Sequence, residues 1–170
     1  MQHTPSSRHP SHLSPRRLTS ALLLVAFVLL LPPPLEAASA AAAFRGKVVT
    51  SAIPLTPTGE EASFFAYLRQ RHQAELPRPA SGAWLVHLIA FFHEPIGDTQ
   101  CHVAFYRLRG KEPPEFVEAF GQQVTASQEN LSTKVELSPE RFTPGTYELR
   151  ITRLVRGKEE VYARSQLTLK

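Results

Sequence analysis

Residues 84–93 constrain the fold of this chain more than any other segment, because their side chains alternate with the period of two that is typical of a β-strand. One alternate set is entirely apolar and consists of Trp84, Val86, Leu88, Ala90 and Phe92. The other set is interrupted only by histidines and consists of Leu85, His87, Ile89, Phe91 and His93. A strand with two apolar faces needs cover on both sides, so this pattern predicts a central strand of a sheet.

Strand patterns recur along the rest of the chain and are separated by turn signals. They cover residues 44–53, 100–109, 116–125, 131–137, 146–155 and 161–169. The turn over 94–98 is short, which predicts that residues 100–109 return as the hairpin partner of residues 84–93. Gly121 predicts a β-bulge within its strand.

The last two strands are predicted to form a hairpin whose register keeps their apolar residues on one face. These residues are all odd-numbered: Tyr147, Leu149, Ile151, Val155, Val161, Ala163, Leu167 and Leu169. Because directly opposed residues share a face, the numbers of opposed residues must sum to an even number. The loop must then hold an odd number of residues, so Arg156-Gly157-Lys158 is predicted, with Gly157 at a positive φ.

Seven strands with turns about every 8–12 residues predict a mainly β fold, in which two antiparallel sheets form a β-sandwich. The segment over residues 137–151, with Pro144-Gly145-Thr146-Tyr147 at its centre, resembles the approach to the penultimate strand of immunoglobulin-like and fibronectin-like domains. The resemblance implies that the Tyr147 hydroxyl bonds back to the upstream backbone and that Trp84 is buried. The cysteine pair of antibody domains is missing, and because such folds host many functions the resemblance implies no activity.

One helix is predicted before the central strand, over residues 59–73, and it is foreign to that resemblance. Thr58 and Glu61 match a capping box at its start. The Pro-rich linker over residues 76–82 follows its end. The apolar segment Phe64-Phe65-Ala66-Tyr67 is predicted to cover one end of the sandwich, and a docking surface is the alternative.

Residues 1–40 have the parts of a cleavable signal peptide. The first 17 residues contain no acidic residue and three arginines, Arg8, Arg16 and Arg17. The apolar run Ala21–Leu31 is too short for a bilayer core of about 30 Å, which needs roughly 20 helical residues. Small residues at 38–40 then predict cleavage after Ala40, with cleavage after Ala37 as the alternative. An uncleaved N-terminal anchor and a twin-arginine signal are two competing interpretations of the same segment.

The predicted mature chain, residues 41–170, is one domain of about 130 residues with 16 basic and 14 acidic side chains. So small a net charge gives no argument for a nucleic-acid partner. Cys101 is the only cysteine, which excludes an intramolecular disulfide. The mature chain has no segment long and apolar enough to span a membrane. The sequence therefore predicts a periplasmic or secreted domain and leaves its oligomeric state open.

The side chains best suited to chemistry lie around the predicted central hairpin: His87, His93, Cys101 and His102. Imidazoles and a thiolate suit Zn or Cu, although their spacing here matches no known ligand signature. A five-residue loop places His87, His93 and Cys101 on one face, whereas a four-residue loop places His102 with His93. Neither register gathers all four, so no metal ligand or cofactor is assigned. The simpler interpretation is a half-buried strand residue, two turn residues and a small core thiol.

A basic stripe is expected on the outward face of the last hairpin, where Arg150, Arg164 and Lys170 lie with Tyr162 and Gln166 beside them. Arg with Tyr suits carboxylates, phosphates or sugars, but a solvated sheet face is the simpler interpretation. The chain contains neither a G-x-S-x-G motif nor a glycine-rich phosphate loop, so no catalytic residue is assigned.

These patterns favour an exported, non-enzymatic β-sandwich module that binds a protein or a surface polymer. A periplasmic or secreted metal-binding protein that uses the hairpin His and Cys side chains is the alternative hypothesis. A hydrolase whose site is spread over several loops is the third.

Overall fold

The structure is a computed structural model, which describes residues 41–56, 59–80 and 82–170. All of these residues belong to one compact unit. The predicted signal peptide over residues 1–40 and Thr58 of the predicted capping box lie outside the described residues. Within the described part of the chain, no helix is long and apolar enough to cross a membrane.

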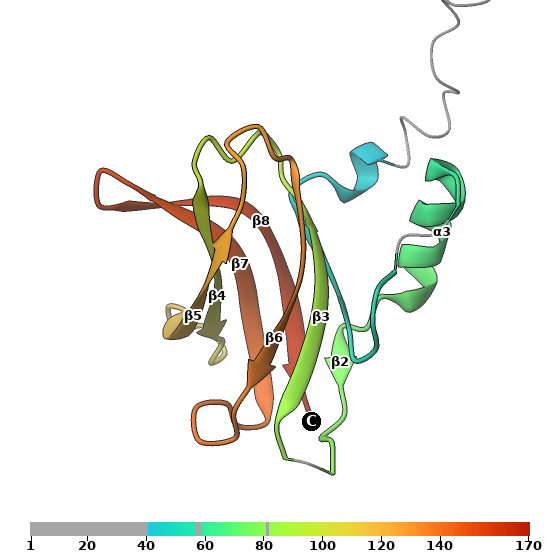
Figure 1. Cartoon of the computed structure of the whole chain (residues 1–170). Helices are drawn as coiled ribbons and strands as arrows, with labels where there is room; N and C mark the ends of the chain where they lie inside the picture. The colour runs from blue at the N-terminus through green and yellow to red at the C-terminus, as the bar shows by residue number, and fades with distance from the viewer. Residues whose placement is uncertain (1–40, 57–58, 81) are drawn as a thin grey trace, which may run out of the picture. The chain divides into compact units, whose positions relative to one another are not determined.

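The fold is mainly β, as predicted. The strands are β1 (Lys47–Ser51), β2 (Glu75–Leu76), β3 (Trp84–Phe91), β4 (Gln100–Arg107), β5 (Glu115–Gln123), β6 (Asn130–Leu137), β7 (Gly145–Val155) and β8 (Lys158–Leu169). In the described part of the chain they form one hydrogen-bonded sheet in the order β5-β4-β7-β8-β1-β3-β6, with β2 beside β8 (Figure 1). A division into two separate sheets is therefore not confirmed.

The sheet curls so far that its two edge strands, β5 and β6, approach each other and enclose the core. Thr133 on β6 donates a hydrogen bond to the side-chain carbonyl of Gln122 on β5, over 2.7 Å. Inward-facing side chains from every long strand gather in this interior, and Val86, Phe105 and Leu149 are completely buried there. The nearly closed sheet thus buries its own inner face, as two facing layers do in a sandwich.

The predicted hairpin between residues 84–93 and 100–109 is wrong. β3 pairs with β1 and β6, whereas β4 pairs with β5 and β7. The connection between β3 and β4 crosses the end of the curled sheet, where Ile96 is fully buried and its N–H donates to the carbonyl of Gln128. Burial of Ile96 anchors this connection to the core at that end of the sheet.

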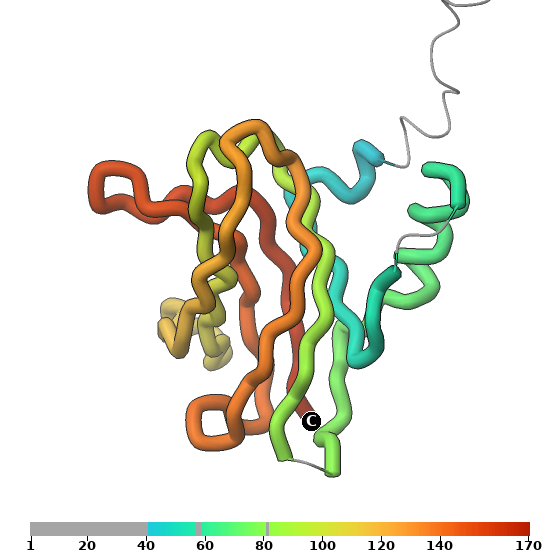
Figure 2. Tube along the Cα trace, in the orientation of Figure 1, coloured from blue at the N-terminus to red at the C-terminus, as the bar shows by residue number. Residues whose placement is uncertain are grey.

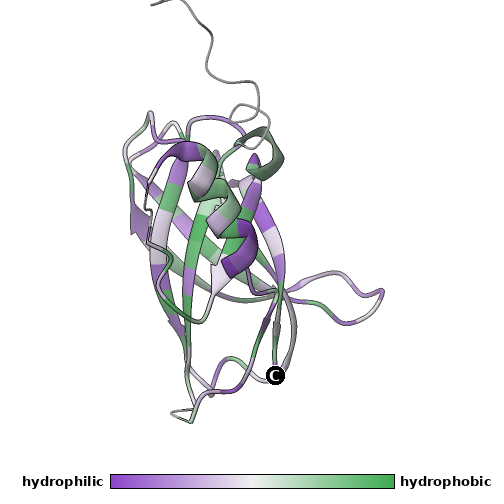
Figure 3. Cartoon of the chain, turned by 90° about the vertical axis from the view of Figure 1, so that its right-hand side faces the viewer, coloured by the Kyte–Doolittle hydropathy of each residue, from purple (hydrophilic) through white to green (hydrophobic). Residues whose placement is uncertain are grey.

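Helix α3 (Glu61–Arg71) covers the outer face of β1 and β3 rather than an end of the sheet, as Figure 3 shows. Phe65 and Leu68 of the helix are buried against Val49 of β1 and Ile89 of β3. This second cluster explains why both alternate sets of β3 are apolar. As predicted, β3 is paired on both sides and covered on both faces, although only the edge strand β6 lies beyond it. The helix begins after Glu60, whose carbonyl accepts a 2.6 Å hydrogen bond from the Ser63 hydroxyl.

The β7–β8 hairpin confirms the predicted parity next to the core but not the predicted loop. Opposed residues such as Ile151 and Ala163 sum to an even number, yet Thr152 opposes Val161, so Tyr162 is an extra, bulged residue. The turn then holds only Arg156 and Gly157, with φ of 51° and 78°. Two successive positive φ values are the signature of a type I′ turn, whose twist matches that of the strands. Beyond the bulge the hairpin projects as an arm (Figure 2).

The predicted bulge at Gly121 is also wrong, because Gly121 pairs regularly with His102. The register shift falls between Phe105 and Tyr106, and it leaves Val117 as the extra residue of β5. Val117 packs partly buried against the core, while Phe116 stays on the outer face. Burial of Val117 thus decides the position of the bulge.

Both side-chain features implied by the immunoglobulin-like resemblance are present. The Tyr147 hydroxyl donates to the Thr143 carbonyl over 2.7 Å and accepts from the Thr143 N–H over 3.1 Å. Trp84 is buried in the core. An immunoglobulin-like fold itself is not confirmed.

Candidate binding surface

The four His and Cys candidates lie on different sides of the sheet. The Cys101 side chain is fully buried inside the curl, and this burial raises the pKa of the thiol from 9.0 to about 11. His102, the next residue, lies on the outer face, and His87 lies on the outer face of β3 between Ser51 and Lys134. Burial, and then the Lys134 charge, lower the pKa of His87. In the described part of the chain, no three His, Cys, Asp or Glu side chains are placed to hold a metal ion.

His93 instead joins the end of β3 to the bulge in β8. Its main-chain N–H and its ring Nδ1 lie 3.1 and 3.0 Å from the Tyr162 carbonyl oxygen, so Nδ1 carries the proton and donates. The imidazole also stacks on the Tyr162 ring, with 5.4 Å between centroids. The remaining nitrogen, Nε2, is 3.4 Å from the Glu94 carboxylate. This arrangement gives His93 a structural role.

The predicted basic stripe is largely neutralised. Arg150 forms ion pairs with Glu148 and Glu159 at 2.7 and 3.4 Å, and Lys170 forms one with Glu75 at 3.1 Å. Tyr162, which was expected beside the stripe, is only 3% exposed, because the bulge turns its side chain toward the core. Arg164 remains exposed, 3.9 Å from Glu148. The positive charges of Arg150, Arg164 and Lys170 therefore all lie near carboxylates, and they do not form a concentrated anion site on this face.

A groove of about 270 Å³, here called the outer groove, crosses the outer face of β4, β5 and β7. It exists because small residues occupy the middle of that face. Ala104 of β4 lies directly opposite Ala119 of β5, and Thr152 of β7 adjoins them through its pairing with His102. Larger side chains on both sides rise above this floor, so the local choice of small residues makes the hollow.

Tyr106 and Phe116 form one end of the outer groove. Their rings meet edge to face, with 5.6 Å between centroids. The Arg150 guanidinium lies 4.1 Å from the centroid of the Tyr106 ring, and the Tyr106 hydroxyl donates to Glu159 over 2.7 Å. Burial, followed by the bond to Glu159, raises the pKa of Tyr106 to about 12. Tyr106 is thus a neutral aromatic side chain whose orientation is fixed by its contacts with Phe116, Arg150 and Glu159.

Phe116 and Leu154 give this groove its apolar exposure. Phe116 is 57% exposed and Leu154 is 66% exposed, the highest values among the large hydrophobic residues of the described chain. Scattered exposed apolar residues are normal, but here two of them flank one concave surface beside an aromatic ring. An apolar side chain of a partner would find contact on three sides.

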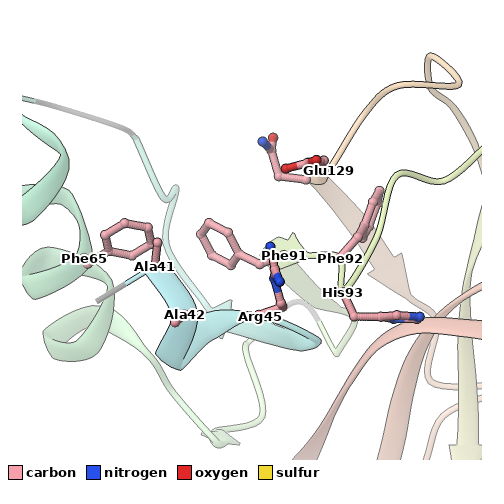
Figure 4. Close-up of a pocket in the computed structure, with 9 residues that line it drawn as sticks. Ala41, Ala42, Arg45, Phe65, Phe91, Phe92, His93 and Glu129 are labelled. Atoms are coloured by element: carbon pink, nitrogen blue, oxygen red, sulfur yellow. The ribbon is translucent and has the colours of Figure 1, made fainter. Parts of the chain in front are cut away.

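A second hollow of about 390 Å³, here called the helix pocket, lies between α3, the end of β3 and the start of β6 (Figure 4). Its apolar wall consists of Ala41, Ala42, Phe65 and Phe91, and Phe92 also lies at the pocket although its ring packs in the core. Its polar side chains are those of Arg45, His93, Glu129 and Asn130. The pocket depends on the helical turn over residues 41–44, which carries the first residues after the predicted cleavage site.

Both surfaces depend on residues that no sequence pattern singled out, above all Phe116, Leu154, Arg45 and Glu129. Leu154 nevertheless offered a signal, because it is an even-numbered apolar residue in a strand whose core residues are odd-numbered. Comparison with protein-family models found no match, and comparison with the curated proteins found none either.

Proposed function

We propose that this chain is an exported binding module, without enzymatic activity of its own, that takes an apolar side chain of a protein partner into the outer groove. The observation that supports the proposal most is the exposure of Phe116 and Leu154 on either side of a floor of small residues. Protein interfaces concentrate their energy in aromatic residues and arginines that surround a pocket. Tyr106 and Phe116 supply the aromatic residues of the groove, and Arg150 lies against the Tyr106 ring, 4.1 Å from its centroid.

The signal-peptide pattern of residues 1–40 supports export as part of the same proposal. The back bond of Tyr147 and the burial of Trp84 support a distant kinship with immunoglobulin-like modules, which commonly bind partners through an exposed sheet face. The metal-binding alternative loses its support, since Cys101 faces the core while His87 lies on the outer face of β3 and His93 bonds to Tyr162.

Site-specific photo-crosslinking in cells that express the full chain tests the proposal. Phe116 is replaced by p-benzoylphenylalanine, which keeps an aromatic ring in the groove. The matched control carries the same photoreactive residue at Ile53, which is 46% exposed but does not line the groove. We expect a discrete protein adduct from position 116 that is absent from position 53 and is reduced several-fold by Leu154→Ser. Adducts of equal yield at both positions, or an adduct that Leu154→Ser leaves unchanged, would contradict the proposal.

A further inference from the structure

The helix pocket has the dimensions and the lining of a site for a small molecule. Its volume of about 390 Å³ falls within the range of roughly 300–1,000 Å³ that is typical of ligand pockets. Phe65 and Phe91 lie 5.6 Å apart, centroid to centroid, and supply an aromatic wall on one side. Such a wall favours a ligand with a flat or aliphatic apolar body.

Two oppositely charged and exposed side chains border this pocket without pairing with each other. The Arg45 and Glu129 side chains form no ion pair and no hydrogen bond within the described part of the chain. In Figure 4 they enter the view from opposite sides, with the Phe91 ring beside the space between them. The other two polar side chains are less available, because His93 already bonds to Tyr162 and Asn130 carries no charge.

We propose that the helix pocket binds a small zwitterion with an apolar side chain, such as a free apolar amino acid. Arg45 holds the carboxylate of the ligand, Glu129 holds its ammonium group, and the Phe65–Phe91 wall contacts its side chain. A planar guanidinium suits a carboxylate because two N–H groups can donate in parallel. An anion without an ammonium group leaves Glu129 unpaired beside it, and a cation without a carboxylate leaves Arg45 unpaired. Only a ligand with both groups satisfies the two side chains together.

NMR titration of the isotope-labelled protein, recovered from cells that express the full chain, tests this inference with three probes of nearly equal shape. L-Phenylalanine carries both charges, phenylalaninamide lacks the carboxylate, and 3-phenylpropionate lacks the ammonium group. The amides of Gly46 and Asn130 report from beside the pocket. We expect saturable binding of phenylalanine that is about tenfold tighter than binding of either analogue.

Matched variants test which side chain binds the carboxylate of the ligand and which binds its ammonium group. Arg45→Gln is expected to remove the preference for phenylalanine over its amide, and Glu129→Gln to remove the preference over 3-phenylpropionate. Arg164→Gln, an exposed arginine outside the pocket, and Leu154→Ser in the outer groove are expected to change neither preference. Absence of saturable phenylalanine binding, equal binding of all three probes, or an equal loss with Arg164→Gln would overturn the inference. None of these results affects the crosslinking test of the outer groove.

Discussion

Replacement of Tyr147 by Phe isolates the back bond that closes the turn before β7. The Tyr147 ring is 1% exposed and packs on Phe142, with 5.6 Å between centroids. The substitution keeps that ring contact and removes only the hydroxyl, which donates to the Thr143 carbonyl and accepts from the Thr143 N–H. Any change in stability therefore measures these two hydrogen bonds.

The expected loss follows from the number of bonds and from the exposure of their partner. Each of these partly buried hydrogen bonds contributes a net ~0.5–1.5 kcal/mol, so removing both costs about 2 kcal/mol. Because Thr143 is exposed, water can reach its main-chain groups, and the larger penalty for stranded polar groups does not apply. For a domain of this size, about 2 kcal/mol lowers the melting temperature by roughly 8 °C.

The assay is urea unfolding followed by fluorescence of Trp84, which is the only tryptophan and is 2% exposed. The matched control is Tyr67→Phe, since the half-exposed Tyr67 hydroxyl on α3 makes no hydrogen bond within the described chain. We expect the control to change the free energy of unfolding by less than about 0.5 kcal/mol. Equal effects of the two substitutions, with unchanged dependence on urea, would refute the reasoning about the back bond.

Three further predictions concern other parts of the fold. Burial raises the folded-state pKa of Cys101 from 9.0 to about 11, so the folded state favours the protonated thiol. The resulting contribution to the free energy of unfolding is complete below pH 9 and is lost as the pH rises to 11. Because the raised pKa of Tyr106 lowers stability only above pH 10, the range from pH 9 to 10 isolates Cys101: there the urea midpoint of Cys101→Ala should decline less than that of the unsubstituted protein, and an identical decline would contradict the assignment. Burial lowers the pKa of His72 from 6.5, and its Nδ1 accepts the Thr50 N–H over 3.2 Å, so stability is present above pH 6.5 and falls at lower pH. His72→Gln, which can still accept that bond, should flatten the acid decline in the same measurement. Gly157→Ala should cost about 1 kcal/mol in urea unfolding, because φ is 78° and an added Cβ meets nothing within 4 Å, which leaves only backbone strain.

The sequence predicted most of the strands and, apart from Tyr162 at the bulge, the main core-facing side chains of the long strands, because both follow from a period of two. It also predicted that β7 pairs with β8, but not which strands lie beside β3. Alternation is identical whether β3 lies beside β4 or beside β6, so only the burial of Ile96 and the remote partners decide. The same limit applies to the second apolar set of β3, where Ile89 needs a cover that the sequence alone could not identify as α3.

The candidate surfaces were less predictable than the fold, because they are made by register rather than by reactive side chains. The sequence analysis chose His and Cys residues as candidates because their side chains are reactive. In the structure, however, Cys101 is an ordinary core residue and His93 bonds to the backbone of β8. The outer groove requires Ala104 to face Ala119, which is a fact of the β4–β5 register. The helix pocket requires Arg45 and Glu129 to lie at the same hollow although they are 84 positions apart in the sequence. No local sequence pattern predicts that two such distant residues lie close together.

The bulge at Tyr162 links the hairpin to both surfaces. Without the extra residue, Thr152 would oppose Tyr162, and the aromatic ring would lie on the outer face while Glu159 turned away from it. With the bulge, Tyr162 enters the core and stacks on His93, which fixes the end of β3 beside the helix pocket. The same bulge also places Glu159 on the outer face. There its carboxylate accepts a hydrogen bond from the Tyr106 hydroxyl and forms an ion pair with Arg150 at the edge of the outer groove. Bulges reorient side chains without changing the rest of a strand, so one inserted residue places Glu159 at the edge of the outer groove and fixes His93 beside the helix pocket.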